Sequence, residues 1–182
     1  MTILIVGASG ATGSKLVEQL LERKQHVKVI VRSPEKLPES WKENKNLQII
    51  SASVLDISDK ELSGYIDYVL MNTTGNRNRD LNEPISFAQK CVIGLLRLIL
   101  PPHVDNEKAA DYLRTTLGQN NQFIEWAAVR PDGLINEDEV TEYEIYPSPI
   151  RSAIFNAGKV SRINVGHFMA TLIFNTDLWN KW

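Results

Sequence analysis

The chain has 182 residues, a length that favours a single domain because domains commonly contain about 100–200 residues. Hydrophobic residues make up 43% and charged residues 23%, a composition that excludes wholesale disorder. The formal net charge of −2 provides no basic excess for a nucleic-acid partner. Cys91 is the single cysteine, which excludes an intramolecular disulfide and a multi-cysteine metal site, so no bound metal is expected.

The N-terminal part of the chain has the pattern of a strand, a glycine-rich loop, a helix and a second strand. The apolar run at residues 2–6 predicts a strand covered on both faces, and residues 27–31 predict another. Residues 14–23 between them have apolar side chains at helical spacing. These elements form a βαβ unit, whose crossover is normally right-handed.

Neither a signal peptide nor a membrane-spanning segment is predicted. The first strand has no basic residues before it, and it enters the glycine-rich loop directly. No apolar run reaches the roughly 18 residues that a spanning helix needs. The longest such run, residues 91–100, is interrupted by Gly94 and Arg97. A cytoplasmic protein without a membrane partner is therefore expected.

The three glycines of the loop each have a separate structural role. Gly7 allows a tight turn, Gly10 lets backbone amides approach a pyrophosphate, and Gly13 lets the helix pack closely on the sheet. The helix N-terminus presents unpaired N–H groups and the positive end of its dipole to phosphates. The loop is thus predicted to bind a dinucleotide. Its candidate binding residues are Gly7, Ala8, Ser9, Gly10, Ala11, Thr12 and Gly13.

The spacing of these glycines, G-x-x-G-x-x-G, differs from the G-x-G-x-x-G of most Rossmann dehydrogenases. It resembles the cofactor loop of the atypical, NmrA-like NAD(P)H-binding branch of the short-chain dehydrogenase/reductase superfamily. That branch is similar to flavin and biliverdin reductases, epimerase relatives and redox-sensing regulators. The resemblance implies an α/β protein, a three-layer α/β/α Rossmann fold with a mainly parallel, doubly wound sheet. A single domain over residues 1–182 is expected, with residues 135–182 forming a small substrate-side region.

Arg32 indicates which nicotinamide cofactor is preferred. It stands 19 positions after Gly13, where an NAD site places a carboxylate for the ribose 2′-hydroxyl. An arginine there suits the 2′-phosphate of NADP instead, with Ser33 and Lys36 beside it. Glu35 is the residue that would oppose this choice. NADP(H) is therefore predicted to be preferred over NAD(H).

Further cofactor contacts are expected after the third and fourth predicted strands. Residues 47–50 predict the third strand, and Ser53 holds the place of an aspartate that meets the adenine in relatives. Asp56 is an alternative for that contact. Residues 66–71 predict the fourth strand, after which the resemblance implies a turn lining the cofactor. The residues of that turn are Thr73, Thr74 and Gly75.

The next stretch is predicted to contain two helices separated by a strand. A helix is expected over residues 82–94, followed by a fifth strand at residues 97–100 that two prolines end. Asp105 or Asn106 is expected to cap the next helix, and Gly118 to end it.

The last part of the chain is predicted to contain a sixth strand, paired strands and a helix. Residues 123–130 give the strand, and the acidic stretch 135–145 is expected to be a solvated loop or a sheet edge. Residues 148–163 predict a hairpin or paired strands. Asn164 is expected to cap the final helix.

The tyrosine–lysine pair of classical family members is missing. Those enzymes use Y-x-x-x-K, with the tyrosine as proton donor, and no tyrosine of this chain has a lysine four positions later. The resemblance makes Lys108 the counterpart of the lysine that holds the nicotinamide ribose, but Val104 stands at the tyrosine position. His103 is the candidate replacement acid because imidazole titrates near neutral pH. The other interpretation is a loop histidine satisfied by backbone or water.

Two functions follow from this pattern. The first is an NADPH-dependent oxidoreductase that transfers hydride to a flavin, a quinone or a similar small conjugated acceptor, because solvent can supply any proton that such an acceptor takes. The alternative is a non-catalytic NADP(H)-binding redox sensor or regulatory protein, which the missing tyrosine also suits. The implied partner is the small-molecule acceptor, and a homodimer is left open.

Overall fold

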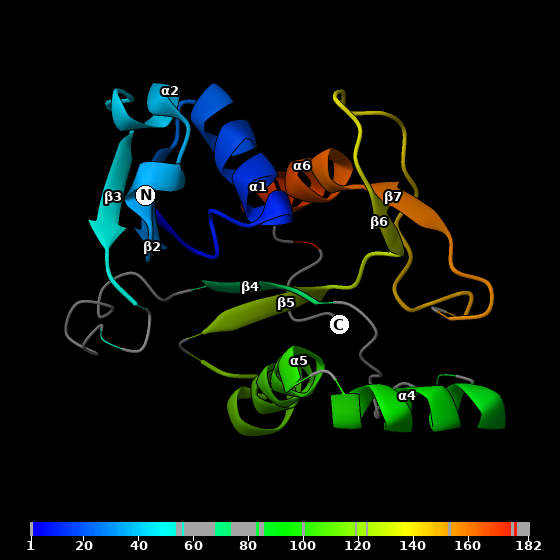
Figure 1. The fold of residues 1–182 in the computed structure, drawn as a ribbon. Coiled ribbons are helices and arrows are strands. Elements are labelled where there is room, and N and C mark those ends of the chain that lie inside the picture. The colour runs from blue at the N-terminus through cyan, green and yellow to red at the C-terminus, as the bar shows by residue number, and fades with distance from the viewer. Residues whose placement is uncertain are drawn as a thin grey trace. The chain divides into compact units, whose positions relative to one another are not determined.

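The computed structural model describes residues 2–53, 56, 68–73, 83, 86–99, 101–118, 120–122, 124–152, 154–175 and 177. The chain forms two compact units (Figure 1). Unit 1 contains residues 1–67, 136–141 and 161–175, and unit 2 contains residues 68–135, 142–160 and 176–182. Helices alternate with parallel strands, which confirms the predicted α/β class.

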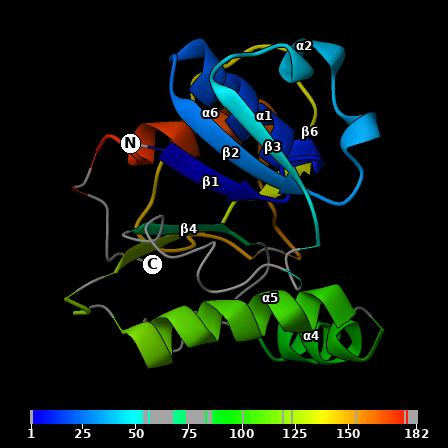
Figure 2. The same cartoon turned by 90° about the vertical axis from the view of Figure 1, so that its left-hand side faces the viewer.

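A parallel sheet of three strands forms the centre of unit 1. The strands β1 (Thr2–Val6), β2 (His26–Val31) and β3 (Leu47–Ser51) lie side by side in that order (Figure 2). Ile5 of β1 stands opposite Val29 of β2, and both side chains are buried. The predicted runs at residues 2–6, 27–31 and 47–50 are confirmed, because their apolar β-rich sequences match buried parallel strands.

Two helices cover one face of this sheet (Figures 1 and 2). They are α1 (Ala11–Glu22) and α6 (Arg162–Leu172), which pack against each other. A Cβ at Gly166 of α6 would lie 2.8 Å from the carbonyl carbon of Lys15 and 2.9 Å from the amide nitrogen of Leu16. Such distances are too short for a side chain, so glycine is needed where the two helices approach.

The connection from β2 to β3 contains two short helices. The 3₁₀ helix η1 (Pro34–Lys36) comes first and α2 (Glu39–Lys42) follows. The side chain of Trp41 is only 5% exposed, so α2 is held to unit 1 by a large buried aromatic ring.

The cap of α6 is Ser161, and the prediction that Asn164 caps this helix is wrong. Ser161 Oγ accepts a hydrogen bond from the backbone N–H of Asn164 at 3.2 Å. The side chain of Asn164 bonds instead to Thr141, accepting from its backbone N–H and donating to its hydroxyl, both at 2.9 Å. A serine three residues earlier fits the N-cap position, and the amide is used to hold a distant loop.

Ser161→Ala is expected to lower the free energy of unfolding by about 1 kcal/mol, because the N–H of Asn164 loses its capping acceptor. Urea unfolding followed by circular dichroism measures the change. Ser40→Ala is the matched control, since Ser40 is an exposed serine within α2. Equal stability of the two variants would contradict the assignment of the cap.

Unit 2 is built on a parallel pair of strands. These are β4 (Tyr68–Asn72) and β5 (Glu125–Val129), with Asn72 opposite Val129. Trp126 of β5 is fully buried. It belongs to a core cluster whose other buried members are Ala110, Leu113 and Ala128. The strands predicted at residues 66–71 and 123–130 are thus confirmed where the structure describes them.

The strand predicted at residues 97–100 is wrong. Helix α4 (Phe87–Ile99) includes residues 97–99, and it also extends past the predicted end at residue 94. A short apolar run fits either a strand or a helix. Here Arg97 of α4 forms hydrogen bonds with Glu107 of the following helix, at 2.8 and 3.0 Å.

The next helix begins earlier than predicted. Helix α5 (Pro101–Tyr112) contains Asp105 and Asn106 in its interior, so neither residue caps it. Prolines are tolerated in the first helical turn, where their missing N–H groups are not needed. A π-helical turn, η3 (Leu113–Leu117), follows and ends at Gly118 with φ of +70°. Gly118 ends the helix as predicted.

Two short strands pair differently from the prediction. Strand β7 (Lys159–Ser161) pairs with β6 (Gly133–Ile135), not with a strand inside residues 148–158. The backbone N–H of Gly133 donates to the carbonyl of Gly158 at 3.0 Å. A Cβ at Gly158 would lie 2.8 Å from Arg151 Nη1, so the chain passes close to that side chain. Glu137, Asp138 and Glu139 are exposed and lie in the expected solvated loop.

Within the described part of the chain, no helix is both long enough and apolar enough to cross a bilayer.

Candidate cofactor-binding site

The glycine-rich loop begins with a tight turn directly after β1. Gly7 has φ of +80°, a conformation that favours glycine. Its carbonyl accepts a hydrogen bond from the backbone N–H of Gly10 at 2.9 Å. The turn therefore reverses the chain at the carboxyl end of a parallel strand, where open α/β sheets hold their ligands.

The first turn of α1 lies against this reversed chain. A Cβ at Gly13 would lie 2.9 Å from the carbonyl carbon of Gly7 and closer still to its oxygen. A Cβ at Gly10 would lie 3.1 Å from the same oxygen. The carbonyl group of Gly7 thus occupies the space that a side chain at Gly10 or Gly13 would fill, so both positions need glycine.

The N-terminus of α1 has the properties of an anion site. Gly10 occupies the N-cap position without a side-chain cap, and no acidic residue lies in the first turn. The backbone N–H groups of Ala11, Thr12 and Gly13 donate to no acceptor among the described residues. These groups and the helix dipole together favour a phosphate at this position.

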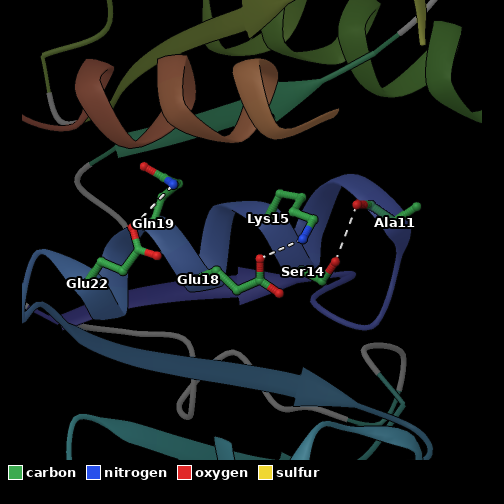
Figure 3. Close-up of polar contacts among 6 residues, drawn as sticks. All are labelled: Ala11, Ser14, Lys15, Glu18, Gln19 and Glu22. Carbon is green, nitrogen blue, oxygen red and sulfur yellow. Dashed lines mark hydrogen bonds and ion pairs between the residues drawn. The ribbon is translucent and has the colours of Figure 1, made fainter. Parts of the chain in front are cut away.

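The polar side chains of α1 interact along the helix and not across its N-terminus (Figure 3). Lys15 Nζ lies 2.8 Å from Glu18 Oε2, and Gln19 Nε2 donates to Glu22 Oε2 at 3.3 Å. Ser14 Oγ donates to the carbonyl of Ala11 at 3.3 Å. The carboxylates of α1 therefore begin at Glu18 and leave the glycine loop free of negative charge from this helix.

The residues predicted to bind the adenosine end of the cofactor lie at the same sheet edge. Arg32 directly follows β2, is exposed, and forms no ion pair or hydrogen bond with a described residue. The backbone N–H of Ala52 donates to the carbonyl of Val31 at 3.1 Å, so the chain after β3 lies beside the chain after β2. Unit 1 thus brings Ser53 close to Arg32, with Ser33 adjacent in sequence.

The predicted contacts after β4 are described only in part. Thr73 lies at the carboxyl end of β4, and its N–H donates to the carbonyl of Val129 at 2.9 Å. Its side chain is 2% exposed. Thr74 and Gly75 lie outside the described residues. Thr73 directly follows β4, and its role in lining a cofactor stays a prediction.

His103 and Lys108 lie in a different setting from the one predicted. The sequence placed His103 in a loop after a fifth strand, but both residues belong to α5. Lys108 is exposed, and Val104, one helical turn earlier, is half-buried. Val104, which the resemblance aligned with the classical tyrosine, is aliphatic and has no hydroxyl group to donate a proton. The roles of His103 and Lys108 stay predictions.

A buried ion pair lies at the end of β5, where the sequence predicted no functional group. Arg130 Nη1 lies 2.7 Å from Glu83 Oε1, and each side chain is 9% exposed. Burial lowers the pKa of Arg130, although the Glu83 carboxylate acts in the opposite direction. An arginine directly after an apolar strand is the local signal for this site. Glu83 carries no such signal because its partner is distant in sequence.

Asn72, the last residue of β4, has an unsatisfied amide oxygen. Its Oδ1 atom is buried and accepts no hydrogen bond from a described residue. A buried acceptor of this kind costs about 1–3 kcal/mol unless a water or a ligand satisfies it. Among the described residues, no three His, Cys, Asp or Glu side chains come together as a metal site.

A glycine turn, a helix N-terminus without a side-chain cap and a parallel strand end are together the features of a Rossmann-fold, NAD(P)-binding protein. Residues 7–98, just over half of the chain, match the model of the NAD(P)H-binding family. The chain belongs to this family. This membership confirms the resemblance to the atypical, NAD(P)H-binding short-chain dehydrogenases/reductases that the glycine spacing indicated.

Part of the chain is similar to a plant protein. An uncharacterized chloroplastic protein of Arabidopsis thaliana is 40% identical over 77 residues, which cover 41% of this chain. The match spans 28% of the length of that relative. The similarity therefore concerns a segment and not the whole of either protein.

Solved structures share the fold over almost the whole chain. A candidate epimerase from Bacteroides thetaiotaomicron has a TM-score of 0.69 at 19% identity, covering 99% of this chain and 94% of that one. A Rossmann-fold NAD(P)-binding protein from Shigella flexneri has a TM-score of 0.59 at 18% identity, covering 97% and 87%. A candidate NADH-flavin reductase from Streptococcus pneumoniae has a TM-score of 0.57 at 14% identity, covering 100% and 96%. At these identities the likeness establishes the Rossmann fold.

Proposed function

We propose that this chain binds NADPH and transfers its hydride to a small conjugated acceptor such as a flavin or a quinone. The observation that carries the proposal is the open N-terminus of α1 above the glycine turn. No side chain caps it, no carboxylate lies in its first turn, and its free N–H groups suit a pyrophosphate. Family membership supports a nicotinamide cofactor.

The preference for NADPH over NADH rests on Arg32. Its guanidinium is exposed and not held by a described residue, so it is free to bind a 2′-phosphate with two parallel hydrogen bonds. A carboxylate at this place would instead repel that phosphate. Glu35 and Lys36 follow in η1 and are both exposed, so their opposite charges offset each other.

The proposed chemistry requires little of the protein beyond binding and orientation. The bound cofactor supplies a hydride, and a flavin or quinone accepts it while solvent supplies the proton. Lys108 is proposed to donate hydrogen bonds to the nicotinamide ribose, as its counterpart does in relatives. No tyrosine of this chain has a lysine four positions later, so carbonyl reduction by the classical pair is not part of the proposal. Acceptors that need no fixed proton donor are favoured.

A second function is favoured by the aliphatic side chain of Val104. A protein that binds NADP(H) without turnover needs no proton donor, and Val104 fits that role equally well. Such a redox sensor must bind the oxidised and reduced cofactor with different affinities. Oxidation of NADPH by a flavin or quinone acceptor therefore separates the two functions.

Arg32→Glu is expected to remove the cofactor preference. In the unchanged protein, calorimetric titration should give NADPH at least about tenfold tighter binding than NADH, a difference of about 1.4 kcal/mol. The variant should bind NADPH no better than NADH, because a carboxylate repels the 2′-phosphate and accepts from a ribose hydroxyl. Lys45→Glu makes the same change of charge at an exposed site of unit 1 and controls for net charge.

The titration also tests the proposed function as a whole. Absence of binding by either cofactor would overturn it. Binding with NADPH oxidation would support the reductase, whereas binding without oxidation, tighter for one redox form, would support the sensor.

A further inference from the structure

The buried ion pair at the end of β5 is not explained by stability. Arg130 Nη1 and Glu83 Oε1 are 2.7 Å apart, and both side chains are 9% exposed. Removing two charges from water costs about as much as their attraction returns, and apolar pairs of similar volume are often equally stable. A charged pair in such a place therefore points to a role that apolar residues would not fill.

The pair lies at the carboxyl end of the parallel strands β4 and β5. Thr73 donates its backbone N–H to the carbonyl of Val129 at 2.9 Å, and Arg130 is the next residue after Val129. Glu83 follows Thr73 by ten positions in the sequence. The pair therefore joins the chain that follows β4 to the end of β5, at the carboxyl edge where α/β sheets hold ligands.

A second observation at this edge also points to a ligand. Asn72 Oδ1 is buried and accepts no hydrogen bond from a described residue. A ligand N–H or O–H group at this position would satisfy it. Asn72 stands opposite Val129 in the strand pair, so this acceptor and Arg130 belong to neighbouring strand ends.

We infer that Arg130 and Glu83 are positioning residues, which hold Asn72 and Thr73 in the geometry that binds the nicotinamide end of the cofactor. The inference rests on the proposed function. Neither charged residue needs to touch the cofactor, because each acts through the strand end that the pair fixes. Arg32 and Ser53, the residues proposed for the adenosine end, follow other strands (β2 and β3), so binding of that end should not depend on the pair.

The test replaces both charges with apolar side chains in the variant Glu83→Leu/Arg130→Met. We expect this protein to unfold within a few degrees of the unchanged one and to bind NADPH at least about tenfold more weakly. Its affinity for adenosine 2′,5′-bisphosphate, the adenosine end of NADPH, should be unchanged. Calorimetric titration measures both affinities. Unchanged NADPH affinity in a folded double variant would overturn the inference.

A second ion pair of unit 2 provides the matched control. Arg114 Nη2 lies 3.2 Å from Asp111 Oδ1, and the two residues belong to η3 and α5 and not to a strand end. The variant Asp111→Leu/Arg114→Met should leave both affinities as they are. A loss of NADPH affinity equal to that of the test variant would show that any ion-pair replacement has this effect, which would also overturn the inference.

Two further results complete the test. If the double variant does not fold, Arg130→Lys decides, because lysine keeps the charge but not the planar guanidinium. Weaker NADPH binding with unchanged fragment binding would support the inference, and unchanged binding of both would overturn it. If the protein without substitutions bound neither NADPH nor adenosine 2′,5′-bisphosphate, the proposed function would be wrong, and the inference with it.

Discussion

NADPH binding should be lost when Gly13 is replaced by alanine. The new Cβ would lie 2.9 Å from the carbonyl carbon of Gly7 and closer still to its oxygen, so the turn that receives the pyrophosphate must move. Displaced N–H groups no longer converge on one phosphate. We expect affinity to fall at least about a hundredfold, which is about 2.8 kcal/mol, in calorimetric titration.

Gly94→Ala is the control for this substitution. A Cβ at Gly94 of α4 meets no atom within 4 Å. Alanine is the better helix former by about 1 kcal/mol, so this variant should be at least as stable as the unchanged protein and should bind NADPH equally well. If Gly13→Ala also bound NADPH as the unchanged protein does, the turn would not be the pyrophosphate site.

The largest loss of stability is expected for Trp126→Ala. Trp126 is fully buried in unit 2, and its indole N–H donates to the carbonyl of Gly118 at 2.8 Å. Truncation leaves a cavity among Ala110, Leu113 and Ala128 and removes the partner of a carbonyl. The free energy of unfolding should fall by about 3–5 kcal/mol. Urea unfolding followed by circular dichroism provides the measurement.

Two companion variants separate the contributions at this position. Trp126→Phe keeps most of the packing but removes the hydrogen bond to Gly118, so its loss should be smaller, at about 1–3 kcal/mol. Phe87→Ala removes an aromatic side chain that is 81% exposed and should change stability little. If Trp126→Ala lowered the free energy of unfolding by less than Phe87→Ala does, the assignment of Trp126 to the core would be wrong.

Most of unit 1 can be predicted from sequence because its signals are local. The apolar run of β1 has the same bounds in the sequence and in the structure, at residues 2–6. Gly7 lies at the tight turn that the sequence predicts, and Gly10 and Gly13 lie where two backbone segments approach each other closely. The predicted ends of β2 and β3 also suffice to place Arg32 and Ser53 near each other, because parallel strands bring their carboxyl ends to one edge.

Unit 2 is harder to predict because its decisive signals are ambiguous or distant. Residues 97–100 are apolar over too short a run to separate strand from helix, and the prolines that follow fit the end of one element or the start of the next. The ion pair between Glu83 and Arg130 joins residues far apart in the chain. Pairing of that kind depends on the fold and leaves no periodic pattern.

The packing of α6 on α1 has a consequence for how the protein is made. Unit 1 contains β1, β2 and β3, but its helix α6 comes from residues 162–172, which follow most of unit 2 in the sequence. Until these late residues leave the ribosome, α1 lacks the helix that packs against it through Gly166. Unit 1 therefore completes its packing only after the intervening residues of unit 2 have been translated.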